Sequence, residues 1–456
     1  MSNCLSLSAV AGPLQAEHRG DDVRFCAVSS DTRTLSPGDL FIALQGPNFD
    51  GHRFIGAAKE GGAVAAMVMQ EVDAGLPLLR VADTRQALGR LASIWREAFP
   101  RPLVAVTGSN GKTTVKEMIA AIFRQRGPVL VTQGNMNNDI GVPLTLLRLQ
   151  DEQSMVVEMG ANHPGEIGYL SRIARPDVAL ITNAGAAHLE GFGDLEGVAR
   201  AKGEIVEGLG DDGVLVINGD SPHAPLWRRL AGDRRVVAFG FQAGADVHAD
   251  PARMQTPWGG DGFRMNCRVT TPAGDLEIGL ALVGRHNLMN ALAAIAAAQA
   301  AGATLDEIGA GLCTVHPVKG RLCLRAGRQG YRVIDDSYNA NPDSVSAAIA
   351  VLAQAPGERW LVLGDLAELG AGSRALHRAL GEQARDAGIE HLYTVGEMSA
   401  EAAAGFGEGG AAFTDQAALI ATLRHELPGD ATVLVKGSRS AAMERVADAL
   451  VEEGGC

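Results

Sequence analysis

A glycine-bracketed turn between an apolar segment and a predicted helix constrains this chain more than any other feature. Residues 104–114 read Val-Ala-Val-Thr-Gly-Ser-Asn-Gly-Lys-Thr-Thr. Glycines let backbone N–H groups wrap phosphate oxygens, a lysine at the helix start reaches the terminal phosphates, and a hydroxyl can hold Mg²⁺. The pattern therefore predicts a strand, a phosphate loop and a helix that bind a nucleoside triphosphate. The expected contacts are Gly108, Ser109, Asn110, Gly111, Lys112, Thr113 and Thr114.

The loop is a short variant, because only Ser109 and Asn110 separate its glycines and the general phosphate-loop pattern has more residues there. An alternative is a strand–turn–helix whose glycines serve only the turn. The Lys-Thr-Thr sequence at the helix start disfavours that alternative.

Length and charge bound the class of protein. A chain of 456 residues exceeds the size at which one hydrophobic core stops growing, so we expect several domains and prefer three. The formal net charge is −13, and no cluster of Lys and Arg interleaves with aromatic residues. This balance argues against a nucleic-acid surface, so any phosphate contact should be local.

The cysteines and apolar stretches predict a cytoplasmic protein. Six cysteines are scattered without a Cys-x-x-Cys pair or a regular framework, so we expect reduced thiols in the cytoplasm. The N-terminal residues lack the pattern of a secretory signal. Residues 291–301 form the longest helix-like apolar stretch and are too short for a membrane span, so no span is expected.

Turn signals and strand–helix alternation predict three α/β domains. Residues 1–100 should form a small N-terminal α/β domain that ends at Pro100 and Pro102. Residues 101–315 alternate strands and helices, which favours a mostly parallel sheet, with antiparallel strands appended at about 245–283. Residues 316–456 alternate again and predict a separate Rossmann-like C-terminal domain.

Polar residues at the ends of apolar strands are candidate ligands of the nucleotide. Glu158 ends one such strand and His188 follows another, so both should reach the ligand-binding edge of the sheet. The alternatives are a strand-end ion pair for Glu158 and a structural role for His188. Lys202 is expected near the start of a helix, where its charge is mildly unfavourable, and a solvated lysine is the simpler interpretation.

Further candidates follow toward the C-terminus. Asn287 opens the alanine-rich helix, where it could read an adenine edge or cap the helix. Arg321 could reach a phosphate across a domain junction, or form a structural ion pair. Asp335 and Asp336 end a strand, and the next helix should be capped by Asn341 with Pro342 as its first residue. Capping explains neither the two aspartates nor Asn339 in the same turn.

Taken together, these residues resemble the Mur ligases, ATP-dependent amino-acid ligases of peptidoglycan precursor synthesis, over all three predicted domains. The resemblance implies ATP and Mg²⁺, with Lys112 and Arg321 supplying positive charge at the phosphates. It implies Thr113 and Glu158 as ligands of one Mg²⁺, and His188 with a carbamylated Lys202 as ligands of a second. It also implies that Asn287 faces adenine and that Asp335 or Asp336 faces the ribose.

Four segments, residues 135–143, 336–342, 363–370 and 436–439, resemble the member of the family that acts last. That resemblance implies UDP-N-acetylmuramoyl-tripeptide and D-alanyl-D-alanine as substrates. The first domain would bind the uridine nucleotide, and the third would bind the incoming dipeptide. The implied substrate contacts are Ser30, Asp31, Arg33, Asn137, Asn138, Asn339, Asn341 and Arg439.

Other functions remain open from the sequence. The sister ligase that adds the third residue typically carries an Asp-Asn-Pro-Arg motif, which this chain lacks. A folylpolyglutamate synthase would not need the uridine-type N-terminal segment. An ATP-binding switch or scaffold would leave Glu158, His188 and Lys202 without a purpose. We expect a monomer.

Overall fold

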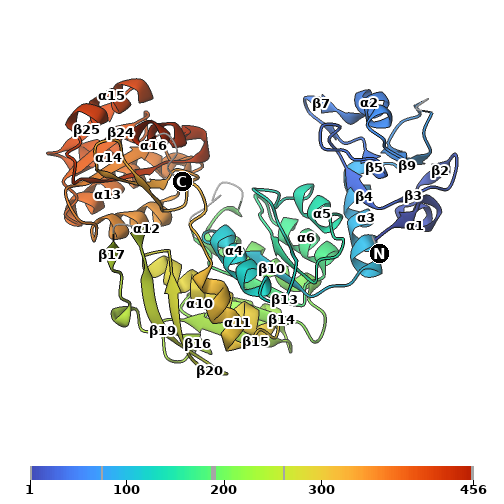
Figure 1. The fold of residues 1–456 in the computed structure, drawn as a ribbon, viewed down its shortest axis with the longest axis horizontal. Coiled ribbons are helices and arrows are strands. Elements are labelled where there is room, and N and C mark those ends of the chain that lie inside the picture. Colours follow the sequence, from blue (N-terminus) through green and yellow to red (C-terminus); the bar gives the residue numbers. More distant parts are fainter. Residues whose placement is uncertain (1–2, 73–74, 186–191, 260–261, 453–456) are drawn as a thin grey trace.

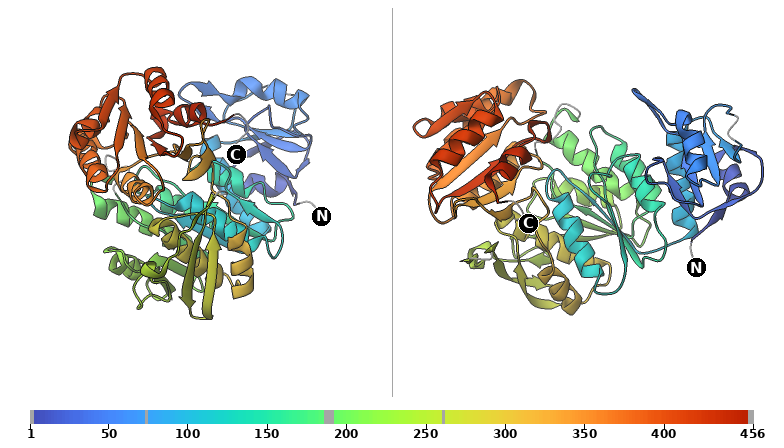
Figure 2. Two further views of the ribbon diagram at one scale, coloured as in Figure 1. Left: turned by 60° about the vertical axis from the view of Figure 1, so that its left-hand side comes forward. Right: turned by 45° about the horizontal axis from the view of Figure 1, so that its top comes forward.

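The structure is a computed structural model in which residues 3–72, 75–185, 192–259, 262–452 are described. The chain folds into three units that follow one another along an arc, with the N-terminal and C-terminal units on either side of the central one (Figure 1). Two further views show the same arrangement (Figure 2). The predicted three-domain α/β architecture is confirmed, because three large and mostly parallel sheets follow one another along the chain.

The N-terminal sheet has the order β2-β9-β8-β5-β4, parallel except for β2. Two short antiparallel pairs, β1 with β3 and β6 with β7, flank it. The strands are β1 Leu5–Ser6, β2 Glu17–Arg19, β3 Arg24–Phe25, β4 Ala27–Ser29, β5 Asp39–Ile42, β6 Gln45–Gly46, β7 Phe49–Asp50, β8 Ala65–Val68 and β9 Leu78–Arg80. The helices are α1 Leu7–Leu14, η1 Gly51–Phe54, α2 Ile55–Glu60 and α3 Thr84–Ala98.

The central sheet has the order β11-β12-β10-β13-β14-β15-β16-β19-β20, parallel as far as β16 and antiparallel from there. The strands are β10 Leu103–Thr107, β11 Val129–Val131, β12 Ser154–Glu158, β13 Val178–Ile181, β14 Val214–Asn218, β15 Arg235–Gly240, β16 Val247–His248, β19 Met265–Thr271 and β20 Gly274–Leu280, with a short pair β17 Trp258–Gly259 and β18 Gly262–Phe263. The helices are α4 Lys112–Phe123, α5 Gly141–Leu146, α6 Glu166–Ala174, α8 Leu195–Gly203, η2 Glu204–Gly208, α9 Ala224–Ala231, η3 Pro251–Arg253, α10 Arg285–Ala300 and α11 Leu305–Cys313.

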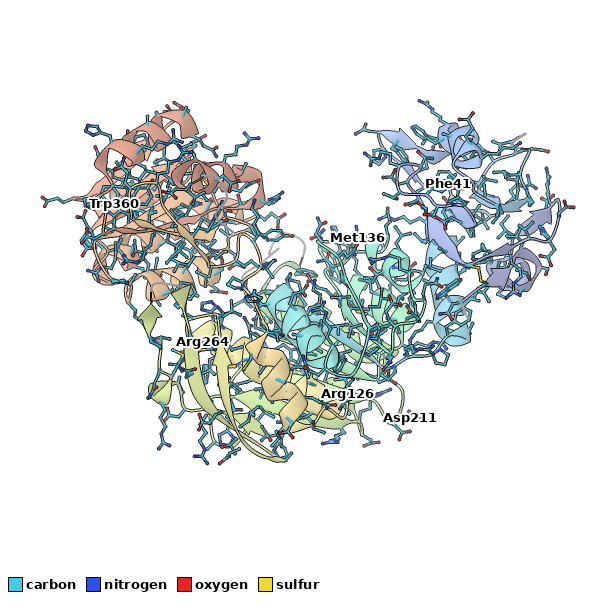
Figure 3. The ribbon with its side chains drawn as sticks, viewed as in Figure 1. Phe41, Arg126, Met136, Asp211, Arg264 and Trp360 are labelled. Atoms are coloured by element: carbon cyan, nitrogen blue, oxygen red, sulfur yellow. A yellow bond between two sulfur atoms is a disulfide. The ribbon has the colours of Figure 1, made fainter. Side chains whose placement is uncertain are left out.

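The C-terminal sheet has the order β21-β22-β26-β23-β24-β25, parallel except for β21. The strands are β21 Cys323–Ala326, β22 Arg332–Asp336, β23 Arg359–Gly364, β24 His391–Val395, β25 Gly410–Phe413 and β26 Thr432–Lys436. The helices are α12 Pro342–Leu352, η4 Gly370–Gly372, α13 Ser373–Asp386, α14 Ala400–Phe406, α15 Gln416–Glu426, η5 Arg439–Ala441 and α16 Glu444–Leu450. Trp360 of β23 lies inside this unit (Figure 3).

Side chains alternate across the central sheet and so build two cores. Along β10, Leu103 and Ala105 join a cluster that also contains buried residues of the N-terminal domain, whereas Val104 and Val106 face α4 and α10. Because parallel strands are buried on both faces, such a strand reads as a continuous apolar run. The phosphate loop therefore leaves a strand that is packed on both sides.

Two expectations from the sequence are wrong. Cys4 and Cys26 form a disulfide, because β1 pairs antiparallel with β3 and brings the two cysteines opposite each other. Their spacing of 22 residues gave no hint of this pairing. Lys202 lies in the last turn of α8, not near a helix start, because Asp194 caps the helix eight residues earlier. There its positive charge is favourable beside the helix dipole.

Among the residues described, we find no helix that is both long and apolar enough to cross a membrane.

Candidate functional site

The phosphate loop joins β10 to α4 with its backbone in conformations that need glycine. Gly108 has φ of +145° and Gly111 has φ of +80°. A Cβ on Gly108 would lie 1.9 Å from Thr182 Oγ1, and one on Gly111 would lie 2.3 Å from Asn290 Oδ1. The close approach of these neighbours fixes the loop in one shape.

Polar residues that follow β13 form hydrogen bonds with the backbone of the phosphate loop. Thr182 Oγ1 donates to the Asn110 carbonyl at 2.6 Å, and the Asn110 N–H donates to Asn183 Oδ1 at 2.9 Å. The Ser109 N–H also donates to the Asn183 carbonyl at 3.1 Å. Sequence reasoning missed Thr182 and Asn183, although they follow an apolar strand as Glu158 does. That shared position was the signal that could have identified them.

The Lys112 side chain turns back toward the phosphate loop. Its Nζ donates to the Gly108 carbonyl at 2.7 Å. Burial lowers the pKa of Lys112, and nearby Glu158 opposes that shift. Thr114 lines the same cavity as Lys112. A γ-phosphate at this position would offer Lys112 an anionic acceptor in place of the neutral Gly108 carbonyl.

Glu158 is the centre of a buried polar network. Its Oε2 accepts from Thr113 Oγ1 at 2.9 Å, and its Oε1 accepts from Asn137 Nδ2 at 2.8 Å. Arg321 Nη2, from the C-terminal side of the cleft, donates to the same Thr113 hydroxyl at 3.1 Å. Arg321 Nε is buried without a hydrogen-bond partner. Two donors of one guanidinium thus lie beside the loop, a suitable arrangement for an anion.

The donor set around Thr113 suits Mg²⁺ better than a metal held by protein alone. Among the described residues, no group of three or more His, Cys, Asp or Glu side chains is arranged to hold a metal ion. Mg²⁺ is commonly bound through one or two carboxylates plus substrate phosphates, and Glu158 with Thr113 offers one carboxylate and one hydroxyl facing the phosphate loop. His188, the other predicted metal ligand, lies outside the described residues.

Lys202 is buried in the same cavity wall. Its side chain lies 5.4 Å from the centroid of the Phe192 ring. Burial, with a smaller contribution from Lys112, lowers the pKa of Lys202 to about 7. At neutral pH a large share of this amine is therefore uncharged and nucleophilic.

The loop opens into a cavity of about 1980 Å³ between the central and C-terminal domains. Asn287 contributes to its wall, but its Nδ2 donates to the Val283 carbonyl and its Oδ1 accepts from Asn290. Asp336 lines the cavity and accepts from Lys436 Nζ at 2.6 Å. Asp335 does not line it, because its carboxylate points to Ser337 and toward Arg325. Of the two aspartates, only Asp336 lines the cavity.

The segment after β22 forms the opposite wall of the cavity. Asn341 caps α12 with Pro342 as the first helical residue, as predicted, and its Nδ2 also donates to Asn110 Oδ1 at 2.8 Å. The Arg439 N–H donates to Asn339 Oδ1 at 3.3 Å. The guanidinium carbons of Arg321 and Arg439 lie 4.4 and 5.7 Å from the centroid of the Tyr338 ring. Tyr338 was not among the predicted site residues.

The loop between β11 and α5 carries the predicted asparagines toward the N-terminal domain. Asn137 reaches Glu158, as described above, whereas Asn138 Oδ1 accepts from the N–H of Gly141, the first residue of α5. Asp139 pairs with Arg85 of α3. Met136 of this loop lies on the side of the central domain that faces the space between the outer domains (Figure 3).

Ser30, Asp31 and Arg33 lie apart from this cavity, and none of the three lines it. They follow β4 in the N-terminal domain, where Arg33 Nη2 pairs with Asp31 Oδ2 at 2.6 Å. The hydrogen bonds from Arg33 lower the pKa of Asp31 to about 2. The Arg33 side chain is largely exposed, although its Nε and Nη2 both donate to the Asp31 carboxylate.

Comparison with known proteins agrees with this arrangement. Family models described as "Mur ligase family, catalytic domain", "Mur ligase middle domain" and "Mur ligase, glutamate ligase domain" match residues 25–96, 106–298 and 320–439. The chain is 47% identical to the UDP-N-acetylmuramoyl-tripeptide–D-alanyl-D-alanine ligase of Escherichia coli (strain K12), covering 99% of each chain.

Solved structures agree over nearly the whole length. MurF from Acinetobacter baumannii is 36% identical with a TM-score of 0.90, covering 98% of each chain. MurF ligase from Thermotoga maritima in complex with ADP is 29% identical with a TM-score of 0.81, covering 93% of this chain and 96% of that one. Three matched domains and a relative of this identity lead to one conclusion: the chain belongs to the Mur ligase family.

Proposed function

We propose that this protein is an ATP-dependent ligase that joins D-alanyl-D-alanine to UDP-N-acetylmuramoyl-tripeptide. The single observation that carries the proposal is the cavity in which the phosphate loop faces the segment 336–341 and Arg439. The likeness to ligases of that specificity over almost the whole chain supports the choice of substrates. The family, the ATP-binding loop and the lack of the sister ligase's motif agree with it.

In the proposed reaction, the terminal carboxylate of the tripeptide attacks the γ-phosphorus of ATP. The bond between the γ-phosphorus and the oxygen that bridges it to the β-phosphorus breaks, which gives an acyl phosphate and ADP. The amine of D-alanyl-D-alanine then attacks the acyl carbon, loses a proton and expels inorganic phosphate. A carboxylate and a triphosphate repel each other, so Lys112, Arg321 and the N–H groups of residues 108–111 would stabilise the developing charge.

The metal ligands follow from the donor groups. Thr113 and Glu158 would hold one Mg²⁺, which when bound would neutralise phosphate charge. His188 and Lys202 are the proposed ligands of a second. An uncharged amine can add CO₂, and the pKa of Lys202 near 7 would leave enough of it uncharged to form the anionic carbamate.

The remaining contacts complete the proposal. Asp336 would face the ribose, and Asn287 would face adenine only after exchanging one of its present hydrogen bonds. Ser30, Asp31 and Arg33 would bind the uridine nucleotide. Asn137, Asn138, Asn339, Asn341 and Arg439 would lie near the tripeptide and the dipeptide.

We also propose that the protein works as a cytoplasmic monomer. Light scattering during turnover would test the monomer.

The decisive experiment measures phosphate release from ATP and Mg²⁺ with UDP-N-acetylmuramoyl-tripeptide, comparing D-alanyl-D-alanine with single amino acids. Release with the dipeptide alone, and a pentapeptide product mass, is the expected result. Release with a single diamino acid on a dipeptide precursor would instead identify a third-residue ligase. ATP turnover that needs no amide partner would favour a nucleotide switch.

A further inference from the structure

A second lysine lies one turn beyond the lysine of the phosphate loop, and the proposed reaction does not use it. Lys116 of α4 is only 2% exposed. Burying an ammonium group costs several kcal/mol unless the group is paired with an opposite charge and hydrogen-bonded. A buried charge so close to the site therefore calls for an explanation.

The Lys116 ammonium joins the helix to the strand beside it. Its Nζ donates to the Thr132 carbonyl at 2.7 Å and lies 3.0 Å from Glu117 Oε1. Thr132 is the first residue after β11 and is 1% exposed. Lys116 thus fixes the point at which the asparagine-bearing loop, residues 132–140, leaves the sheet.

Thr132 in turn holds the proposed metal ligand. Its Oγ1 accepts from the Glu158 N–H at 2.9 Å. The same loop returns at Asn137, which donates to Glu158 Oε1 at 2.8 Å and accepts from the Gly160 N–H at 2.8 Å. Both the backbone and the side chain of Glu158 are therefore oriented by a loop whose base is bonded to Lys116.

We propose that Lys116 is a positioning residue, which through Thr132 holds Glu158 and Asn137 in the geometry that binds Mg²⁺ beside the nucleotide. The proposal rests on the Mg²⁺ site of the proposed function. Residues that orient metal ligands typically contribute about 10- to 100-fold to metal affinity or activity. Lys116 would act without touching the substrates.

The test uses Lys116→Met, which keeps the length of the side chain and removes its charge and donors. Calorimetry would compare binding of ADP with Mg²⁺ to binding of ADP in EDTA. We expect the affinity for Mg²⁺·ADP to fall about tenfold and that for ADP in EDTA to stay unchanged, because the phosphate loop is intact. Lys59→Met, an exposed lysine of α2, is the matched control.

Thr132 gives an independent route if Lys116→Met does not fold. Thr132→Val removes the acceptor for the Glu158 N–H at nearly constant shape and should also weaken Mg²⁺·ADP selectively, whereas Thr132→Ser should restore it. Equal weakening of ADP with and without Mg²⁺ would mean that Lys116 is merely structural. Unchanged Mg²⁺·ADP binding in both Lys116→Met and Thr132→Val would also overturn the proposal.

Glu158→Gln separates this inference from the proposed function. A loss of Mg²⁺ dependence in Glu158→Gln with none in Lys116→Met would overturn only the role of Lys116. No loss in Glu158→Gln would instead remove the metal site on which the inference rests.

Discussion

The two domain junctions of this protein differ in their contacts: the first is largely apolar and the second is largely polar. At the first, α3 of the N-terminal domain packs into the central domain, and one hydrophobic cluster runs through both. At the second, the C-terminal domain meets the phosphate loop through polar contacts, Arg321 with Thr113 and Asn341 with Asn110. Apolar contact there includes Phe263 and Val283, which join the core of the C-terminal domain.

The first junction is also closed by buried polar groups. Trp95 is fully buried and its indole N–H donates to the Leu149 carbonyl. Asn3 donates to the Leu149 and Gln150 carbonyls, and Arg96 donates to the Ala174 carbonyl. Such a junction resembles a domain interior, so we expect the N-terminal and central domains to move as one body.

The second junction is different because ligands must enter it. Its cross-domain hydrogen bonds involve groups that a nucleotide would displace or engage, and inter-domain motion is the default for modest polar interfaces. We therefore expect the C-terminal domain to open and close over ATP. The first junction therefore serves stability and the second serves chemistry, and separate substitutions test the two roles.

The largest expected effect is at the second junction. Arg321→Ala should lower kcat by about 10³-fold or more, because an arginine at a transferring phosphoryl group contributes on that order. The melting temperature of the free protein should change much less, since the hydrogen bond from Arg321 to Thr113 and its contact with the Tyr338 ring are each worth about 1 kcal/mol. Steady-state kinetics and thermal melting measure the two quantities. A large loss of stability with retained kcat would reverse the assignment of this junction.

The next effect belongs to the first junction. Trp95→Ala should lower the free energy of unfolding by about 3–5 kcal/mol, through lost burial and the cavity left between α3 and the central domain. Below the melting transition, kcat should stay near the wild-type value. Denaturant unfolding with parallel assays provides the measurement. If kcat of Trp95→Ala instead fell as much as kcat of Arg321→Ala, α3 would take part in the chemistry.

A smaller effect concerns the cavity floor between the junctions. The pKa of Lys202 is lowered from 10.5 to about 7, so between these values the unfolded state binds more protons and stability rises with pH. Lys202 therefore destabilises the protein most below pH 7 and least above about 10.5. We expect Lys202→Met to be more stable than wild type by roughly 2 kcal/mol at pH 6, about half the free energy of the full pKa shift, because the surroundings of the buried charge relax. This difference in the free energy of unfolding should shrink toward pH 10.

Unfolding in CO₂-free buffer across this pH range measures the margin. A margin independent of pH would mean that Lys202 is not buried as a charged group. If the carbamate forms, added bicarbonate should raise the stability of the wild-type protein at neutral pH and should leave the stability of Lys202→Met unchanged.

Local patterns could be predicted from the sequence wherever one segment carries the whole signal. The predicted strand before the phosphate loop and the Asn341 cap are confirmed, and so is the predicted family. Glu158 lines the cavity beside the phosphate loop, as its position at the carboxyl end of an apolar strand predicts. The roles of the site residues themselves stay predictions.

The two errors have different physical sources. The Cys4–Cys26 pair depends on the pairing of β1 with β3, which no single segment shows. The place of Lys202 depends on a local feature, the Asp194 cap at which its helix begins. Asp335 and Asp336 are neighbours in sequence, yet strand alternation turns only one of them toward the cavity. No local pattern distinguishes which strand face meets a ligand until the neighbouring helix and linker are in place.

The smallest expected effect tests whether the second junction couples its two sides. Asn341→Ser keeps a good cap for α12 but is too short to reach Asn110, so stability should be unchanged while kcat/KM falls about threefold to tenfold, the worth of one hydrogen bond. Asn110→Ser should have a similar effect. If the hydrogen bond is the link between the domains, the double variant should lose no more than either single one, because both remove the same interaction. Additive losses would show that the two asparagines act independently and that closure depends on other contacts, with the Arg321 guanidinium as the next one to vary.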